Sequence, residues 1–341
     1  MKTDTVKTKK QNEYNEKRIQ GEAHGLFIVN KANNDIAKAK NMPNPKMLFS
    51  EFWHEGELCV LYGEAATGKS ALAVQIANSI TRGRPIRDFK MTAKSQKVLY
   101  CDFELSNKQF ENRYSTGFKN HYRFHDRLFR LSLLQGAVLP RSRKFVQYAI
   151  ESLEQHIINK KIKVVIIDNI TFLNNTSSAK QTGNLMGNLK SLKENYGLSL
   201  LVLAHTTKRR GNQPLTINDI MGSSMTGNFM DSSFAIGKSS GQADIRYLKQ
   251  IKERMTEKIY GENNVCVCRL SQEKNFLKFH FVEYGDEEQH LTKGFIIKND
   301  TELKQEITQR HSQGMSLREI ADDLNINHMK VSRVLKKLNA S

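Results

Sequence analysis

Residues 63–70, GEAATGKS, combine two glycines, a lysine and a serine at a spacing suited to phosphate chemistry. The apolar run 58–62 before them and the helical pattern of 71–77 after them predict a strand, a loop and a helix. In such a loop, backbone N–H groups and the helix N-terminus face the phosphates, the lysine reaches the β- and γ-phosphates, and the serine ligates Mg²⁺. The stretch therefore predicts binding of ATP and Mg²⁺ by Gly63, Glu64, Ala65, Ala66, Thr67, Gly68, Lys69, Ser70 and Ala71.

A second candidate metal ligand follows the apolar run 163–167, which ends in Asp168. Taken alone, an aspartate there is typical of an ordinary buried strand with a capping side chain. Beside a phosphate loop, an aspartate at the carboxyl end of a neighbouring parallel strand holds the magnesium shell. We therefore expect this strand to lie beside the loop, with Ser70 and Asp168 as the magnesium ligands.

Two further strand-like runs end in residues that can act on a γ-phosphate. Glu104 follows residues 98–103, and a carboxylate within reach of a γ-phosphate can orient the attacking water. His205 follows the apolar run 198–204. A lone glutamate or histidine at such a position is more often a surface or structural residue, so their order after the phosphate loop carries the functional interpretation.

Taken in order, these segments resemble the motifs of RecA-like ATPases, and His205 is similar to the γ-phosphate sensor of the RepA-type hexameric helicase group. The resemblance covers about residues 48–281. It implies that Glu104 polarises the attacking water. It also implies that Lys252 and Arg254, in the segment KQIKER, act on the nucleotide of a neighbouring subunit in a hexamer. Surface salt-bridge residues are the alternative for this pair.

A basic loop follows His205. Lys208, Arg209 and Arg210 are consecutive cations next to Gly211 and Asn212, and a "GSS" segment at 222–224 follows, as in the same helicase group. Three such cations are not expected to pack in a core and would suit the backbone of a DNA strand that passes through a ring. A solvated charged loop is the alternative.

Amino-acid composition narrows the classes of binding partner. The chain of 341 residues has 53 Lys and Arg against 35 Asp and Glu, a net charge of +18, which favours nucleic acid as a partner. No run approaches the roughly 20 apolar residues of a membrane span, and the first residues lack the apolar core of a signal peptide. We expect a cytoplasmic protein with four structural, unpaired cysteines and no membrane partner.

The predicted fold class is α/β. Near-continuous Val, Ile and Leu runs predict a mostly parallel sheet of a RecA-like P-loop core over 47–299, after a polar arm and linker at 1–46. Residues 300–341 show helical periodicity only and predict a small all-α helix-turn-helix module.

The predicted module has a capping box at 316–319 and a third helix at 329–338. Polar side chains left outside its apolar face would contact DNA; docking of a protein is the alternative. The candidate DNA contacts are Asn327, His328, Lys330, Ser332, Arg333 and Lys337.

Together these features predict an ATPase that couples hydrolysis to movement on DNA, with the RepA-type replicative helicase of a plasmid, phage or mobile element as the leading hypothesis. Single-stranded DNA through a homohexameric ring, duplex DNA at the C-terminal module and a primase or initiator are the partners this hypothesis implies. Two alternatives remain open: an ATP-switched DNA-binding initiator or regulator, and a recombination mediator, neither of which unwinds DNA.

Overall fold

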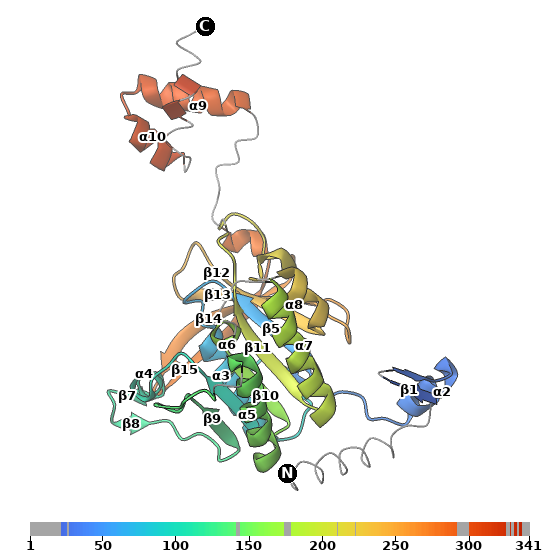
Figure 1. Ribbon diagram of the computed structural model, residues 1–341. Coiled ribbons are helices and arrows are strands. Elements are labelled where there is room, and N and C mark those ends of the chain that lie inside the picture. The colour runs from blue at the N-terminus through green and yellow to red at the C-terminus, as the bar shows by residue number, and fades with distance from the viewer. Residues whose placement is uncertain are drawn as a thin grey trace. The chain divides into compact units, whose positions relative to one another are not determined.

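The computed structural model describes residues 22–25, 27–140, 144–173, 179–209, 211–221, 223–291, 300–324, 328, 331–332 and 334–335 (Figure 1). Contacts between residues divide the chain into two units, Met1–Pro45 and Lys46–Ser341. The division falls next to the expected start of the core at residue 47. A further division at residue 300 stays a prediction.

A nine-stranded sheet forms the centre of the larger unit, in the order β15-β14-β13-β12-β5-β11-β10-β6-β9. Six neighbouring strands run parallel, and the other three extend the sheet from β12, each antiparallel to the strand before it. The parallel strands are β5 Leu58–Gly63, β6 Val98–Asp102, β9 Leu128–Leu131, β10 Val164–Asp168, β11 Ser199–His205 and β12 Ser232–Lys238. The antiparallel strands are β13 Ile245–Lys252, β14 Val265–Glu273 and β15 Phe276–Gly285.

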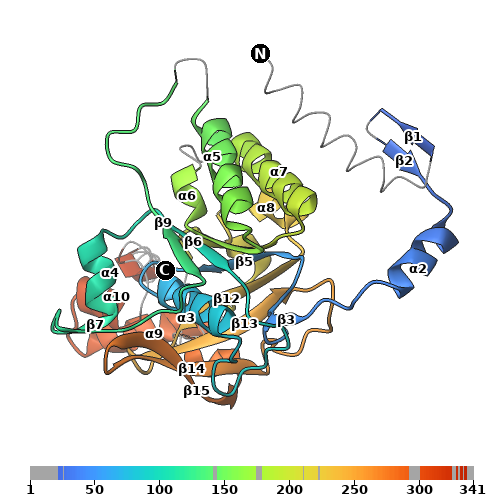
Figure 2. The ribbon, with the colours of Figure 1, turned by 90° about the horizontal axis from the view of Figure 1, so that it is seen from below.

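Helices cover both faces of the parallel part. Helix α3 (Lys69–Arg82) lies on one face, and α5 (Phe145–Lys160) and α7 (Ala179–Tyr196) lie on the other (Figure 2). Alternate side chains of β10 show this directly, because Val164 and Ile166 pack in the cluster that contains α3, whereas Val165 and Ile167 pack with α5 and α7. Such two-sided burial explains the continuous apolar runs and confirms the expected α/β class with a largely parallel sheet.

Shorter elements complete the larger unit. Two pairs of short strands are β3 Met47–Phe49 with β4 Trp53–His54, and β7 Ser115–Thr116 with β8 Asn120–His121. The remaining helical segments are α4 Asn107–Arg113, α6 Ile170–Leu173, η1 Ile217–Asp219, α8 Ser223–Phe229 and η2 Glu287–His290. Among the described residues, no helix combines the length and apolar character needed to cross a membrane.

All four cysteines are free and buried, as expected. Cys59 and Cys101 lie on parallel strands, and Cys266 and Cys268 lie on β14. Burial raises the pKa of each thiol, so these side chains serve as apolar core residues and not as nucleophiles.

The N-terminal unit contains more structure than the sequence suggested. Residues 22–29 form a hairpin of β1 (Glu22–His24) and β2 (Phe27–Val29), followed by helix α2 (Ala32–Lys40). The sequence analysis expected a polar arm and linker here and did not identify this hairpin, and the part of the arm at residues 1–21 lies outside the described residues. The apolar residues of β2 are exposed, which is why no buried pattern marked this strand in the sequence.

Near the C-terminus, helices α9 (Asp300–Ser312) and α10 (Leu317–Asp323) agree with the predicted helices, and the predicted capping box is present, with Ser316 and Glu319 as partners. A small apolar cluster joins both helices to later residues; its buried members are Leu303, Ile307, Ile320, Ala321, Leu324, Val331 and Val334. The residues that follow are helical where described, at 328, 331–332 and 334–335. Four of the predicted DNA contacts lie outside the described residues: Asn327, Lys330, Arg333 and Lys337.

Candidate active site

The phosphate loop joins β5 to α3 through two positions that require glycine. A Cβ atom on Gly63 would lie 2.6 Å from the Ile236 carbonyl oxygen. Gly68, the N-cap residue of α3, has φ 97°, and a Cβ there would lie 2.9 Å from Leu270 Cδ2. These constraints hold the loop in a tight curve at the N-terminus of α3, which is the arrangement that directs backbone N–H groups at an anion.

Lys69 folds back over this loop. Its side chain is buried, and its Nζ atom donates hydrogen bonds to the Gly63 and Glu64 carbonyl oxygens, both at 2.8 Å. Burial lowers the pKa of Lys69 to about 8, while the carboxylates of Asp168 and Glu104 act in the opposite direction. The ammonium therefore lies where the β- and γ-phosphates are held in P-loop proteins.

Asp168 lies at the carboxyl end of β10, and its side chain accepts a hydrogen bond from the Tyr100 hydroxyl. Burial raises the pKa of Asp168 to about 6, against hydrogen bonds from Tyr100 and Ser70 that lower it. Above that pH the Asp168 carboxylate and the Ser70 hydroxyl together offer the hard oxygen ligands that Mg²⁺ prefers, so the donor set fits this metal. Strand β10 is separated from β5 by β11, but the hydrogen bond between Asp168 and Ser70 places its carboxyl end beside the phosphate loop, as expected.

Glu104 and His205 meet at the same edge of the sheet. His205, the last residue of β11, lies with its Nδ1 atom 3.5 Å from Lys69 Nζ and with its Nε2 atom 3.8 Å from Glu104 Oε1. Burial, followed by the charge of Lys69, lowers the pKa of His205, so the imidazole is neutral at pH 7. His205 therefore lies between Lys69 and Glu104.

Asn169 is a site residue that the sequence analysis missed. Its Nδ2 atom donates to Glu104 Oε1 and lies 3.1 Å from His205 Nε2. It directly follows Asp168, through a cis peptide bond, and its position after an identified site aspartate is the one signal that could have marked it. The structure thus gathers Lys69, Glu104, Asp168 and His205 as predicted and adds Asn169 as their link.

The two other candidate catalytic cations lie elsewhere in the chain. Because β13 runs antiparallel to β12, Lys252 pairs with Ser233 near the start of β12, at the edge of the sheet opposite to the phosphate loop. Lys252 Nζ donates to the Gly227 carbonyl oxygen at 2.7 Å, and Arg254 Nη1 lies 3.3 Å from Asp231 Oδ1. Neither can reach the nucleotide of its own chain, so a catalytic role requires a second copy.

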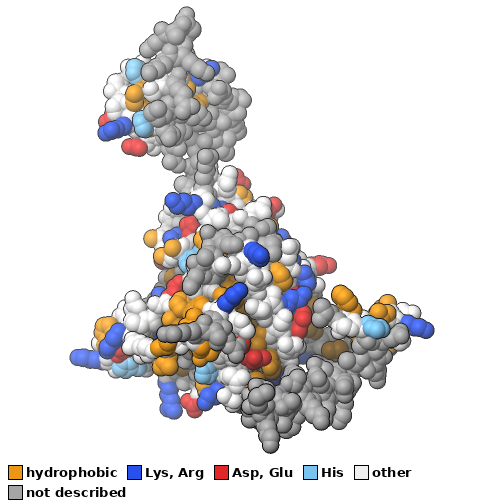
Figure 3. All heavy atoms as spheres, in the orientation of Figure 1, with side chains coloured by type: hydrophobic (Ala, Val, Ile, Leu, Met, Phe, Trp, Pro, Cys, Tyr) orange, Lys and Arg blue, Asp and Glu red, His pale blue; other side chains and the backbone are white. Residues whose placement is uncertain are grey.

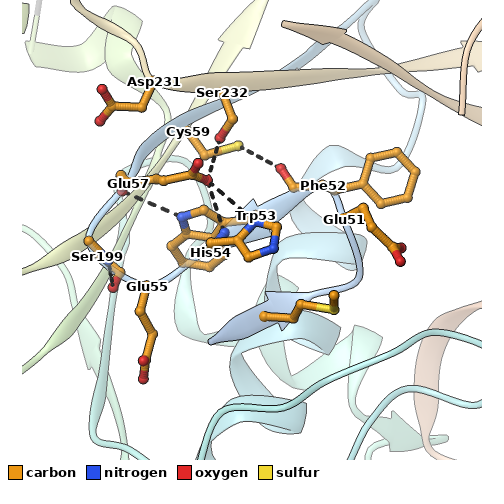
Figure 4. A network of polar contacts seen from close by, with 12 residues as sticks. Glu51, Phe52, Trp53, His54, Glu55, Glu57, Cys59, Ser199, Asp231 and Ser232 are labelled. Atoms are coloured by element: carbon orange, nitrogen blue, oxygen red, sulfur yellow. Dashed lines mark hydrogen bonds and ion pairs between the residues drawn. The ribbon is translucent and has the colours of Figure 1, made fainter. Parts of the chain in front are cut away.

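Two carboxylates, the partly buried Asp231 and the buried Glu57, organise that opposite edge (Figure 4). Asp231 Oδ2 accepts hydrogen bonds from the Leu58 backbone N–H at 2.9 Å and from Lys193 Nζ at 2.7 Å. Glu57 accepts from the Ser232 hydroxyl at 2.8 Å, and burial raises the pKa of Glu57. Arg254 is therefore tied, through Asp231, to the first residue of the strand that leads to the phosphate loop.

The basic loop differs from its expected form. Arg209 has a side chain that is only 8 % exposed, and it lies 3.8 Å from Glu64 Oε1 of the phosphate loop and 3.5 Å from Asp219 Oδ1. The expectation that all three cations stay outside the core is wrong for Arg209, since two carboxylates offset the cost of its burial. Lys208 is exposed, and Arg210 lies outside the described residues.

The surface charge is dispersed where it can be seen. In Figure 3, Lys and Arg side chains on the face shown are mixed with acidic and hydrophobic ones and form no single continuous field. The whole chain has a net charge of +18, and among the described side chains on this face no basic patch stands out (Figure 3).

The phosphate loop at the edge of a largely parallel sheet, with its lysine, serine and aspartate in place, defines a P-loop nucleoside triphosphatase that binds a nucleotide with Mg²⁺. Residues 31–211, just over half of the chain, match the family model described as "AAA domain". The chain belongs to this family.

No curated protein matches the chain. Among solved structures, the chain is similar to the KaiC-like protein PH0186 from the hyperthermophilic archaeon Pyrococcus horikoshii OT3. The sequence identity is 11 % and the TM-score is 0.45, over 67 % of this chain and 91 % of that chain.

Replacing Lys69 by alanine is expected to weaken nucleotide binding about 100-fold, because a charge-assisted hydrogen bond contributes about 1.5–3 kcal/mol. Titration with a fluorescent ATP analogue measures the change. Lys97→Ala is the matched control, since this exposed lysine donates to the Lys160 carbonyl oxygen, away from the loop. Equal affinities for the two variants would contradict the assignment.

Nucleotide affinity is also expected to depend on pH through Lys69. The pKa of this lysine is about 8 in the free protein and must rise when phosphates bind, because they stabilise the ammonium. Nucleotide affinity is therefore highest below pH 8, where Lys69 is protonated in the free protein. Above pH 8 it falls by up to about 10-fold per pH unit, until the pH reaches the pKa of Lys69 in the complex. The same titration between pH 7 and 9.5 tests this, and Lys69→Ala is expected to show a flatter profile; an unchanged wild-type affinity over that range would refute it.

Proposed function

We propose that the protein is an ATP-driven ring motor that moves on DNA, a replicative helicase of the RepA type that serves a plasmid, phage or mobile element. In this proposal Lys69, Ser70 and Asp168 hold MgATP, Glu104 orients the attacking water, and His205 senses the γ-phosphate. Lys252 and Arg254 act on the nucleotide of the next subunit.

One observation carries the proposal: the groups that hydrolysis needs are divided between two edges of the same sheet. Lys69, Glu104, Asp168 and His205 lie at one edge, whereas Lys252 and Arg254 lie at the other. Charge that develops on a transferring phosphoryl group is stabilised by a cation supplied by a neighbour in many nucleotidases. If the Lys252 and Arg254 edge of one copy meets the phosphate-loop edge of the next, one complete site forms at every subunit interface, as a closed ring requires.

DNA is the favoured polyanion. The net charge of +18 supports it, and the exposed Lys208 follows the γ-phosphate sensor, where a loop can respond to the nucleotide. At the C-terminus, α9 and α10 form an apolar cluster with Val331 and Val334, as a helix-turn-helix module would. A primase or initiator would be its partner at a replication origin.

The test is an ATPase assay with and without single-stranded DNA, combined with a mass measurement of the assembly and a fork-unwinding assay. The proposal expects a hexamer whose hydrolysis rises with single-stranded DNA and which unwinds a fork in the presence of ATP. A monomer whose hydrolysis ignores DNA would refute it.

A second candidate function is an ATP-switched initiator or regulator that binds a duplex site without unwinding it. The clustered C-terminal helices favour it, because a helix-turn-helix module binds duplex DNA. Tight binding to a duplex site with no fork unwinding would select this function. Strand exchange in place of unwinding would select a recombination mediator.

A further inference from the structure

The loop that carries Glu104 is held by a carboxylate just before it. Asp102 ends β6, and its side chain is fully buried. Its Oδ1 atom accepts hydrogen bonds from the Glu104 backbone N–H at 3.2 Å and from the Leu105 backbone N–H at 2.9 Å. Asp102 thereby fixes the backbone of the residue expected to orient water.

Arg130 holds Asp102 and the loop together. It lies on β9, the outermost strand of the sheet. Its Nε atom donates to Asp102 Oδ2 at 2.9 Å. Its Nη2 atom donates to the Leu105 carbonyl oxygen at 2.5 Å, and its Nη1 atom donates to Asn107 Oδ1 at 2.6 Å. The guanidinium lies 4.7 Å from the centre of the Phe110 ring, so its orientation is fixed from a fourth direction.

The loop needs such a tether because one of its sides is open. A cleft of about 510 Å³ is lined by residues 102–107 together with Ser132, Leu133 and Gln135. On the opposite side, the Phe103 backbone N–H donates to the Asp168 carbonyl oxygen at 2.9 Å, and Asn169 binds the Glu104 carboxylate. Polar contacts therefore hold this loop in place, whereas apolar packing holds the core.

We propose that Arg130 is a positioning residue for ATP hydrolysis: through Asp102 and the Leu105 carbonyl oxygen it holds Glu104 where it would orient the attacking water. This inference rests on the proposed role of Glu104. Without Arg130, the buried Asp102 carboxylate loses its cationic partner and the loop can shift into the open cleft. A displacement of about 1 Å at a catalytic group can cost about 100-fold in rate.

The experiment compares Arg130→Ala and Arg130→Lys with Arg127→Ala, a nearby arginine that binds Ser95 and not the Glu104 loop. We expect Arg130→Ala to lower kcat about 10- to 100-fold with nucleotide Kd within about 2-fold, and Arg130→Lys to recover part of the loss because it restores the charge without the fork. A kcat for Arg130→Ala equal to that of Arg127→Ala overturns the proposal. Should Arg130→Ala not fold, Asp102→Asn takes its place, with the same two outcomes.

A double variant separates positioning from general stability. If Arg130 acts through Glu104, adding Arg130→Ala to Glu104→Gln produces no further loss of kcat, because the group being positioned is already gone. A further 10-fold loss in the double variant would overturn the proposal. Glu104→Gln also separates the role of Glu104 from that of Arg130: if that variant keeps wild-type hydrolysis, the role of Glu104 itself fails, whereas an inactive Glu104→Gln beside a fully active Arg130→Ala rejects only the positioning role.

Discussion

Glu104→Gln is expected to lower ATP turnover about 1,000-fold while leaving nucleotide affinity within about 2-fold of wild type. The substitution removes the carboxylate that orients water but keeps an oxygen that can accept the hydrogen bond from Asn169. The phosphate contacts of Lys69 and Ser70 do not involve Glu104, so binding survives. Steady-state hydrolysis and titration with an ATP analogue measure the two quantities separately.

The matched control for this prediction is Glu111→Gln. Glu111 lies on α4 in the segment after Glu104, and its carboxylate binds Lys108 and His121. We expect this variant to hydrolyse ATP at the wild-type rate. If Glu104→Gln and Glu111→Gln have similar turnover, another group activates the water.

Arg254→Ala is expected to lower turnover by about 1,000-fold or more in the assembled protein, because a cation supplied by a neighbour contributes about 10³–10⁵ in rate to related reactions. Nucleotide affinity should change little, since Arg254 lies at the edge of the sheet opposite to the phosphate loop of its own chain. Hydrolysis is measured at a protein concentration where the mass of the assembly equals that of the wild type.

Arg269→Ala is the control for this substitution. Both arginine side chains are 52 % exposed and each is paired with an aspartate, Arg254 with Asp231 and Arg269 with Asp244. We expect Arg269→Ala to retain wild-type turnover. Wild-type turnover in Arg254→Ala would remove this residue from the mechanism and leave Lys252 as the remaining candidate.

Much of the fold was predictable because local sequence specifies it. The strands that end at Gly63, Asp168 and His205 are continuous apolar runs, and the two glycines of the phosphate loop leave little freedom in the turn they form. Parallel strands place their carboxyl ends at one edge, so the meeting of Lys69 with His205 followed from topology. These strands lie in the parallel part of the sheet, as the predicted α/β class requires.

What the sequence could not provide depends on contacts between distant segments. Arg130 binds Asp102 from another strand, and nothing in the residues around Arg130 distinguishes it from Arg127. Arg209 was expected to face outward because its neighbours are charged. Its side chain is instead largely buried, where it forms ion pairs with Glu64 and Asp219. The antiparallel strands β13 to β15 lack continuous apolar runs, since only part of each is buried on both faces.

In the proposed motor, two copies of the chain complete each hydrolytic site, and a mixing experiment with Glu104→Gln and Arg254→Ala tests this directly. Each variant alone is expected to be nearly inactive. In a mixed assembly, a Glu104→Gln subunit would supply its intact Arg254 to the intact Glu104 site of an Arg254→Ala neighbour. We expect ATP hydrolysis in the mixture well above that of either variant alone; a mixture no more active than its two components would show that the sites are not shared between subunits.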